Sequence, residues 1–148
     1  MWSTLITGAG TTAFDSLVTD VCIRIRGGVS ADFKEIFRYI ALFDTSALGS
    51  NASISAAVLS VKVFSKLDDL VAAPDWDIYT STPASNTVLV SSDFGQLGTT
   101  SQTGSAQTYA SATDGAYSDF TFNGTGRGNV SKTGISKFGI RNANYDVA

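Results

Sequence analysis

Hydrophobic and polar residues alternate with a period of two along most of the chain, as they do in strands that bury one face. The run over residues 21–25 alternates until Gly27-Gly28 ends it, and the run over 54–64 places its larger apolar residues on one face. The run over 37–43 is apolar on both sides at its middle. Strands buried on both faces read in this way, so we expect the 37–43 strand to be central in the core.

Four further short runs predict strands, because each is bounded by Gly, Pro, Asn or Asp. They are Trp76/Ile78, Thr87–Val90, Phe120/Phe122 and Phe138/Ile140. About seven short strands separated by turns are typical of a sandwich or barrel and not of a βαβ fold. The predicted fold is therefore all-β, an antiparallel β-sandwich with one or two short helical turns.

Two segments carry helix signals, and one carries those of a loop. Ser30 would cap a turn over Ala31–Ile36, and Asn129 would cap a turn over Asn129–Thr133 that Gly134 closes. Residues 96–114 are rich in Gly, Ser and Thr, which predicts a long exposed loop or a poorly paired edge. We expect residues 1–148 to form a single domain, with 1–20 as an N-terminal arm or a first strand that enters the sheet.

Composition adds a surface that is polar without being strongly charged. Of 148 residues, 43% are hydrophobic and only 16% charged, and roughly a quarter are Ser or Thr. The 10 basic and 13 acidic residues give a net charge of −3. Because nucleic-acid binding needs a basic footprint, we expect no nucleic-acid partner.

The residue types that are missing exclude much chemistry. The sequence has no His, which excludes Ser-His-Asp triads, Cys-His dyads and histidine-ligated zinc. The single Cys22 allows neither an internal disulfide nor a thiolate metal cage, and we expect it to pack as a small apolar residue. These absences exclude most hydrolase mechanisms, and we expect no cofactor apart from the calcium considered below.

No stretch reaches the about 18 apolar residues that a membrane span needs, and residues 1–8 lack the basic and apolar regions of a signal peptide. The sequence thus predicts a protein that is neither in a membrane nor exported. Its low-charge, hydroxyl-rich surface is commoner outside cells. A virion protein reconciles the two, because it folds in the host cytoplasm and works outside after lysis; a processed fragment is the alternative.

Two motifs suggest catalysis or nucleotide binding at first sight. Leu5–Ala13 matches a dinucleotide-binding glycine pattern, but residues 14–20 are too few for the crossover helix, so a glycine-rich loop is the better interpretation. Asp75 and Asp77, two apart on a strand, would lie about 6–7 Å apart, near the spacing of an inverting glycosidase. Both are expected to be solvated, because the apolar residues between and after them face the other way, and no second catalytic motif accompanies them.

Four aspartates around one proline-containing connection form a candidate cation site. Carboxylate and carbonyl oxygens are the ligands of hard cations such as calcium. The candidate ligands are Asp68, Asp69, Asp75 and Asp77. No EF-hand-like loop is present, and a solvated acidic loop is the alternative interpretation.

Aromatic residues offer a carbohydrate-binding interpretation, because their faces stack on sugar rings. Tyr109 and Tyr117, in or beside the polar segment 96–114, are the candidates for an exposed pair. Trp76, in an apolar strand, is expected to pack in the core.

Several motifs together resemble a known family. Arg38–Leu48 reads R-x-x-x-x-F-D-T-S-x-L, and Ile54–Leu59 follows with I-x-x-A-x-L. Residues 78–87, 120–123 and 130–141 continue the likeness, which spans Arg38–Asp146. The pattern resembles jelly-roll β-sandwich modules of bacteriophage virion proteins and bacterial surface proteins, related to the DNRLRE domains.

The resemblance implies a structural or adhesive module and not an enzyme: a capsid decoration, head-fibre or tail component in the virion. It also implies a homo-oligomer, a trimer by analogy, in contact with other virion or capsid proteins. The alternative is a carbohydrate-binding or adhesion module of a secreted or cell-surface protein that binds a host glycan. The DNRLRE hexapeptide is absent, so sugar-binding residues of that branch have no counterparts here. Family modules continue past the segment that matches Asn144–Asp146. We therefore expect either a sheet that lacks its closing edge strand or a chain that is the ordered part of a longer one.

Overall fold

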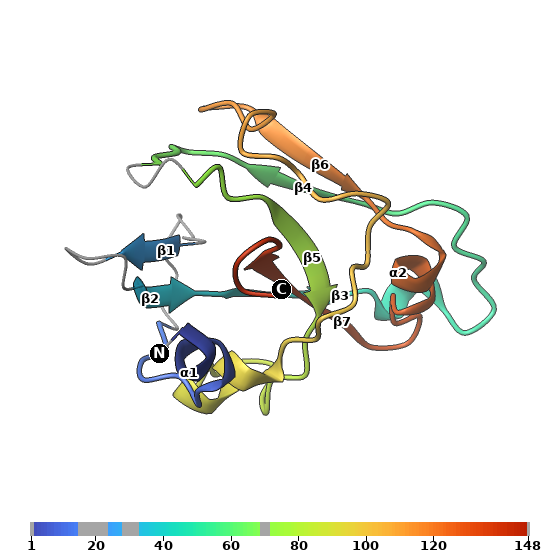
Figure 1. The fold of residues 1–148 in the computed structure, drawn as a ribbon. Coiled ribbons are helices and arrows are strands. Elements are labelled where there is room, and N and C mark those ends of the chain that lie inside the picture. The colour runs from blue at the N-terminus through green and yellow to red at the C-terminus, as the bar shows by residue number, and fades with distance from the viewer. Residues whose placement is uncertain (1, 15–23, 28–32, 69–71, 148) are drawn as a thin grey trace.

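The computed structural model describes residues 2–14, 24–27, 33–68 and 72–147 (Figure 1). In chain order its strands are β1 (Arg24–Gly27), β2 (Phe33–Phe37), β3 (Tyr39–Asp44), β4 (Val58–Lys62), β5 (Trp76–Thr80), β6 (Tyr117–Thr121) and β7 (Ile135–Asn142). Its helices are α1 (Trp2–Thr7), α2 (Gly124–Gly128) and the short 3₁₀ helices η1 (Ser46–Leu48) and η2 (Ser91–Gln96).

Every strand pair among these residues is antiparallel. One sheet has the spatial order β3–β7–β5, while β4 pairs with β6 and β1 pairs with β2. Strands in antiparallel sheets with a few short helices confirm the predicted all-β class. The predicted strands around Leu59, Ile78, Phe120 and Phe138 are confirmed as β4, β5, β6 and β7.

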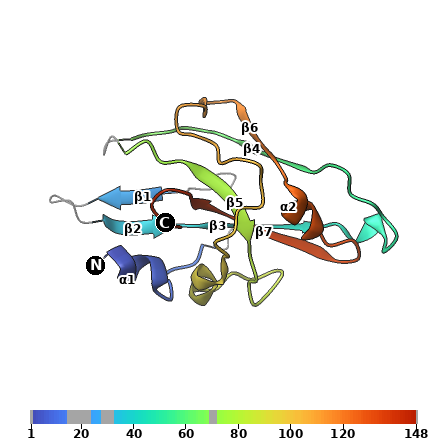
Figure 2. The same ribbon diagram turned by 45° about the vertical axis from the view of Figure 1, so that its right-hand side comes forward.

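The main core lies between the β4–β6 pair and one face of the β3–β7–β5 sheet (Figures 1 and 2). Its buried members are Ile78, Phe120, Phe122, Phe138 and Ile140. The Trp76 ring meets Phe120 edge to face, with 4.9 Å between ring centroids. Such pairs add about 0.5–1.5 kcal/mol beyond the burial of area. Trp76 is thus a core-packing residue, as predicted.

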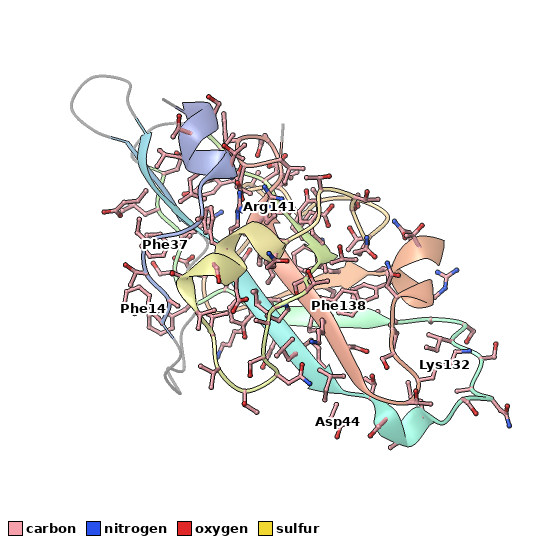
Figure 3. The ribbon with its side chains drawn as sticks, turned by 90° about the horizontal axis from the view of Figure 1, so that it is seen from below. Phe14, Phe37, Asp44, Lys132, Phe138 and Arg141 are labelled. Carbon is pink, nitrogen blue, oxygen red and sulfur yellow. The ribbon has the colours of Figure 1, made fainter. Side chains whose placement is uncertain are left out.

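The opposite face of the β3–β7–β5 sheet is covered by α1 and η2 (Figures 1 and 3). Gly10, which follows α1 with a φ of +64°, lies so close to η2 that a Cβ would clash with the Ser91 carbonyl oxygen. A Cβ on Gly139 of β7 would clash with Leu97 Cδ2. The glycines of the N-terminal motif therefore serve close packing in a loop, as the sequence indicated.

The outer edge of β5 is closed by residues 97–107. The amides of Gly98, Gln102 and Gln107 donate to carbonyl oxygens of β5 over 2.9 Å each. The same segment reaches β6 through the Gly104 amide, which donates to Thr121 O. Of the two interpretations of residues 96–114, the poorly paired edge is confirmed for this part, because Gln102 and Thr103 are buried and not exposed.

The expectation that residues 37–43 form the central strand is wrong. β7 is central and has buried residues on both faces, whereas β3 pairs with β7 alone among the described residues. The run also divides at Arg38, which lies between β2 and β3. The apolar middle of the run lies inside β3, an edge strand whose residues Tyr39–Leu42 are buried or half-buried because the sheet is covered on both faces.

The predicted helical turns are wrong in position. Phe33–Phe37 is strand β2, and Ser30 lies outside the described residues. The C-terminal turn forms earlier, as α2, because the Asn123 side chain accepts from the Gly126 amide at 2.8 Å. Asn129 ends this helix instead of beginning one. Near the N-terminus, residues 2–7 form helix α1, which the alternation did not predict.

Residues 87–90 do not form the predicted strand. Val88 and Val90 are exposed, and their amides donate to side chains, Ser85 Oγ and Asp93 Oδ2 respectively. The local hydrogen bonds of Ser and Asp replace a strand ladder here. The predicted strand over 21–25 is described only from Arg24, as β1, and Cys22 lies outside the described residues.

Candidate functional site

The two candidate sugar-stacking tyrosines differ in their surroundings. Tyr117, on β6, is 67% exposed. Tyr109 is half-buried, its ring lies 4.5 Å from Lys66 Nζ, and its carbonyl oxygen accepts from the same amino group at 2.9 Å. Lys66 therefore covers one face of the Tyr109 ring, and Tyr117 has the more exposed ring of the two for stacking on a sugar.

The candidate calcium ligands are engaged in separate backbone contacts. Asp68 accepts from the amides of Ala72 and Ala73, and Asp75 Oδ1 accepts from the Tyr109 amide at 3.2 Å. Asp69 lies outside the described residues. Within the described ranges, no group of three or more His, Cys, Asp or Glu side chains is placed to hold a metal ion.

Asp77 is buried, so the expectation that it is solvated is wrong. The segment 97–107 covers it: Ser101 Oγ donates to Asp77 Oδ2 at 2.6 Å, and the Thr103 hydroxyl donates to Oδ1. The Ile78 amide also donates to Oδ1, at 2.7 Å. The carboxylate thus ties the polar segment to β5, which removes it from any surface pair with Asp75.

The strongest electrostatic feature of the described residues is a buried Arg–Asp–Arg cluster under the β3–β7–β5 sheet. Asp146 is fully buried, and both of its carboxylate oxygens accept from Arg38 and from Arg141, over 2.6–3.1 Å. Arg38 also donates to the carbonyl oxygens of Phe94 and Ile6. The side chain of Arg141 lies on this face of β7 (Figure 3) and donates to Gly98 O at 2.8 Å.

This cluster is structural in its chemistry, because its donors and acceptors bind one another and the backbone. Burial by itself raises the pKa of Asp146, but the hydrogen bonds and charges of Arg38 and Arg141 outweigh that effect and hold the pKa below its usual value. Close to it, burial followed by the charge of Asp77 raises the pKa of Tyr79 to about 12. Each buried side-chain nitrogen or oxygen of the described residues has a hydrogen-bond partner.

An apolar pocket lies where the outer edges of β3 and β4 face each other, and we call this region the seam. The pocket has a volume of about 180 Å³ and is open to solvent. Phe43 and Thr45 line it from the end of β3, Ala57–Leu59 from β4, and Phe138 from β7. Phe43 and Val58 are 41% and 56% exposed. No backbone hydrogen bond joins β3 to β4 among the described residues.

Sequence reasoning missed the seam, since no local pattern shows which strand edges a fold leaves unpaired. One motif does mark its border. The Thr45 hydroxyl of the F-D-T-S motif donates to Ser131 O at 2.6 Å and lies 2.7 Å from Ser136 Oγ, which fixes the end of β3 against the start of β7. The motif thus has a structural role beside the pocket.

No family model matches the chain, and comparison with curated proteins and with solved structures gave no match either. The likeness to the phage and surface modules therefore stays a prediction from motifs. Within the part of the chain that the structure describes, no helix is both long and apolar enough to cross a membrane.

Proposed function

We propose that this chain is a non-enzymatic structural protein of a virion, a capsid decoration, head-fibre or tail component that acts through contacts with other copies. The fold that goes with this proposal is a jelly-roll β-sandwich, in which the β4–β6 pair and the β3–β7–β5 sheet belong to the two layers. The motif resemblance supplies the virion context.

The observation that carries the proposal is the seam. It combines an apolar pocket, two exposed apolar side chains beside it, and strand edges without backbone partners among the described residues. Unpaired edges invite pairing with another chain. A surface with few charges also loses little solvation energy when another protein covers it.

The buried ionisable groups support a structural role. Asp77, Asp93 and Asp146 each accept hydrogen bonds that fix loops or the C-terminal segment. A catalytic carboxyl group needs access to substrate, and these three are covered.

Light scattering coupled to size-exclusion chromatography tests the proposal, over about 1–100 µM protein. We expect a mass that is a multiple of 15.5 kDa, and the trimer that the resemblance favours is one such result. A monomer over the whole range would overturn the proposal.

Glycan binding is the second candidate, and the exposed ring of Tyr117 favours it. A glycan array with the native chain and with Tyr117→Ala and Tyr109→Ala separates the two functions. Saturable binding to a monomer that is lost in Tyr117→Ala supports the glycan-binding module, whereas stable oligomers that bind no glycan support the structural protein.

A further inference from the structure

The outer edge of β4 presents backbone groups that have no partner among the described residues. The Phe122 amide donates to Ala57 O at 2.9 Å, so Ala57 faces β6. Hydrogen-bonding direction alternates along an antiparallel strand. The backbone groups of Val58, Ser60 and Lys62 therefore point away from β6, toward the seam. The hydrogen bonds of β6 show the same alternation. Thr121, which is paired with Val58, directs its carbonyl oxygen away from β4, to the Gly104 amide on the far side of β6.

Among protein partners, an extended chain fits such an edge, because donors and acceptors alternate along it at strand spacing. The outer edge of β5 shows this in the same molecule, since residues 97–107 supply it with backbone hydrogen bonds. Natural edges that stay unpaired are often protected by proline, a bulge or several charges. The register of β4 with β6 is regular, and Lys62, its last residue, is its single charged member.

The sequence of β4 is suited to pairing with itself. An antiparallel pair centred on Ser60 places Val58 opposite the second copy's Lys62, so that all three outward-facing residues bond reciprocally, with about six hydrogen bonds in total. On the inner face, Leu59 meets the second copy's Val61, and both already pack against the core. In this pairing the two Lys62 residues lie about 14 Å apart, which exceeds the Debye screening length at physiological salt, so their charges repel only weakly.

We propose that β4 is an interface strand on which β4 of a second copy pairs antiparallel about Ser60, giving one sheet in the order β6–β4–β4–β6. The contact covers Val58, which is 56% exposed and lines the seam pocket. The inference rests on the proposed function and names its surface. Because the contact is two-fold, it predicts assemblies with an even number of copies.

Ser60→Pro tests the contact, with Ser60→Ala as its matched control. Proline removes the outward amide of residue 60 without removing a β4–β6 hydrogen bond, and edge positions of this kind tolerate proline. Both variants lose the 2.6 Å hydrogen bond from Ser60 Oγ to Asp119. We expect Ser60→Pro to raise the dissociation constant about tenfold or more, since two reciprocal hydrogen bonds are lost, and Ser60→Ala to associate like the native chain.

Cysteine crosslinking gives a second readout that does not depend on the proline variant folding. In a Cys22→Ser background, Ser60→Cys places two thiols on directly opposed residues about 5.5 Å apart between Cα atoms, within disulfide range. Asp119→Cys is the control, because it lies one strand further out in each copy and would be about 14 Å from its mate. We expect a disulfide-linked dimer from Ser60→Cys and none from Asp119→Cys.

The outcomes separate this inference from the proposed function. Three results would overturn the β4 contact: oligomers that persist in Ser60→Pro, assemblies with only odd numbers of copies, or equal crosslinking through residue 119. Each of them would still allow a structural role through another surface. A native chain that is monomeric throughout overturns both.

Discussion

The two faces of the β3–β7–β5 sheet are buried by different chemistry. Toward β4–β6 the contacts are apolar and include two edge-to-face ring pairs. Toward α1 and η2 the face carries Arg38, Arg141 and Asp146, which are almost fully buried. Apolar packing loses stability in proportion to the atoms removed, whereas a buried ion cluster fails when any one charge is left unpaired. The comparison predicts a graded loss of stability for small changes on the apolar face and a large loss when one charge is removed from the ionic face.

The largest effect is expected from Asp146→Asn, which keeps the side-chain volume but leaves two buried guanidinium groups without their counter-charge. We expect a loss of about 3–5 kcal/mol in the free energy of unfolding, measured by urea denaturation. Asp119→Asn, at an exposed aspartate, is the control and should change stability by about 0.5 kcal/mol or less. Equal losses in the two variants would show that the buried ion cluster contributes no more to the free energy of unfolding than an exposed aspartate does.

Gly139→Ala tests how tightly the face beneath the sheet is packed. The new methyl group would overlap Leu97 and also approach Tyr39 O at 3.0 Å, and overpacking of this kind costs about 1–3 kcal/mol. Adding Leu97→Ala should relieve part of the overlap, so the double variant should be more stable than the sum of the single changes predicts. Additive losses would contradict the contact between residues 97 and 139.

On the apolar face, Phe120→Leu removes ring atoms and the edge-to-face contact with Trp76. We expect a graded loss of about 1–2 kcal/mol, since leucine still fills much of the space. Thermal and urea unfolding measure it. A loss as large as that of Asp146→Asn would remove the contrast between the two faces.

The smallest effect is expected in acid. The pKa of Asp146 is lower in the folded state than in the unfolded chain, so its stabilising effect is fully present above the unfolded pKa and is lost as pH falls through the folded pKa. Native stability should therefore decline below about pH 4, and the decline should be shallower in Asp146→Asn. Parallel curves for the two proteins would exclude Asp146 as a source of the acid dependence.

Sequence reasoning located β4, β5, β6 and β7, but it did not show that β5 and β7 are buried on both faces. Leu59 and Val61 alternate with exposed residues on β4, so the period of two located this strand. Asp77 lies on a strand with both faces covered, where a polar side chain does not indicate exposure to solvent. Hydroxyl groups of Ser101 and Thr103 make that burial possible, from a segment that no periodicity connects to β5.

The buried cluster gave no sequence signal of its own, because Arg38 and Asp146 are 108 positions apart. Both residues do lie in the segments that carry the family resemblance, at its first and last positions. The motif therefore marked residues that matter to the fold before any geometry was known. The helix signals were weaker still, since Asn123 and Asn129 carry the same capping group. The structure uses Asn123 as the N-cap of α2, where Gly126 packs closely against Gln102.

The span of the Arg38–Asp146 contact also has a kinetic consequence. A pair so far apart in the chain closes a long loop, so we expect it to form late in folding, together with the pairing of β3 and β7 that places Tyr39 beside Ile140. Interactions absent from the folding transition state slow unfolding and leave the folding rate almost unchanged. We therefore expect the ion cluster to slow unfolding, and so to lengthen the lifetime of the native state, more than it accelerates folding.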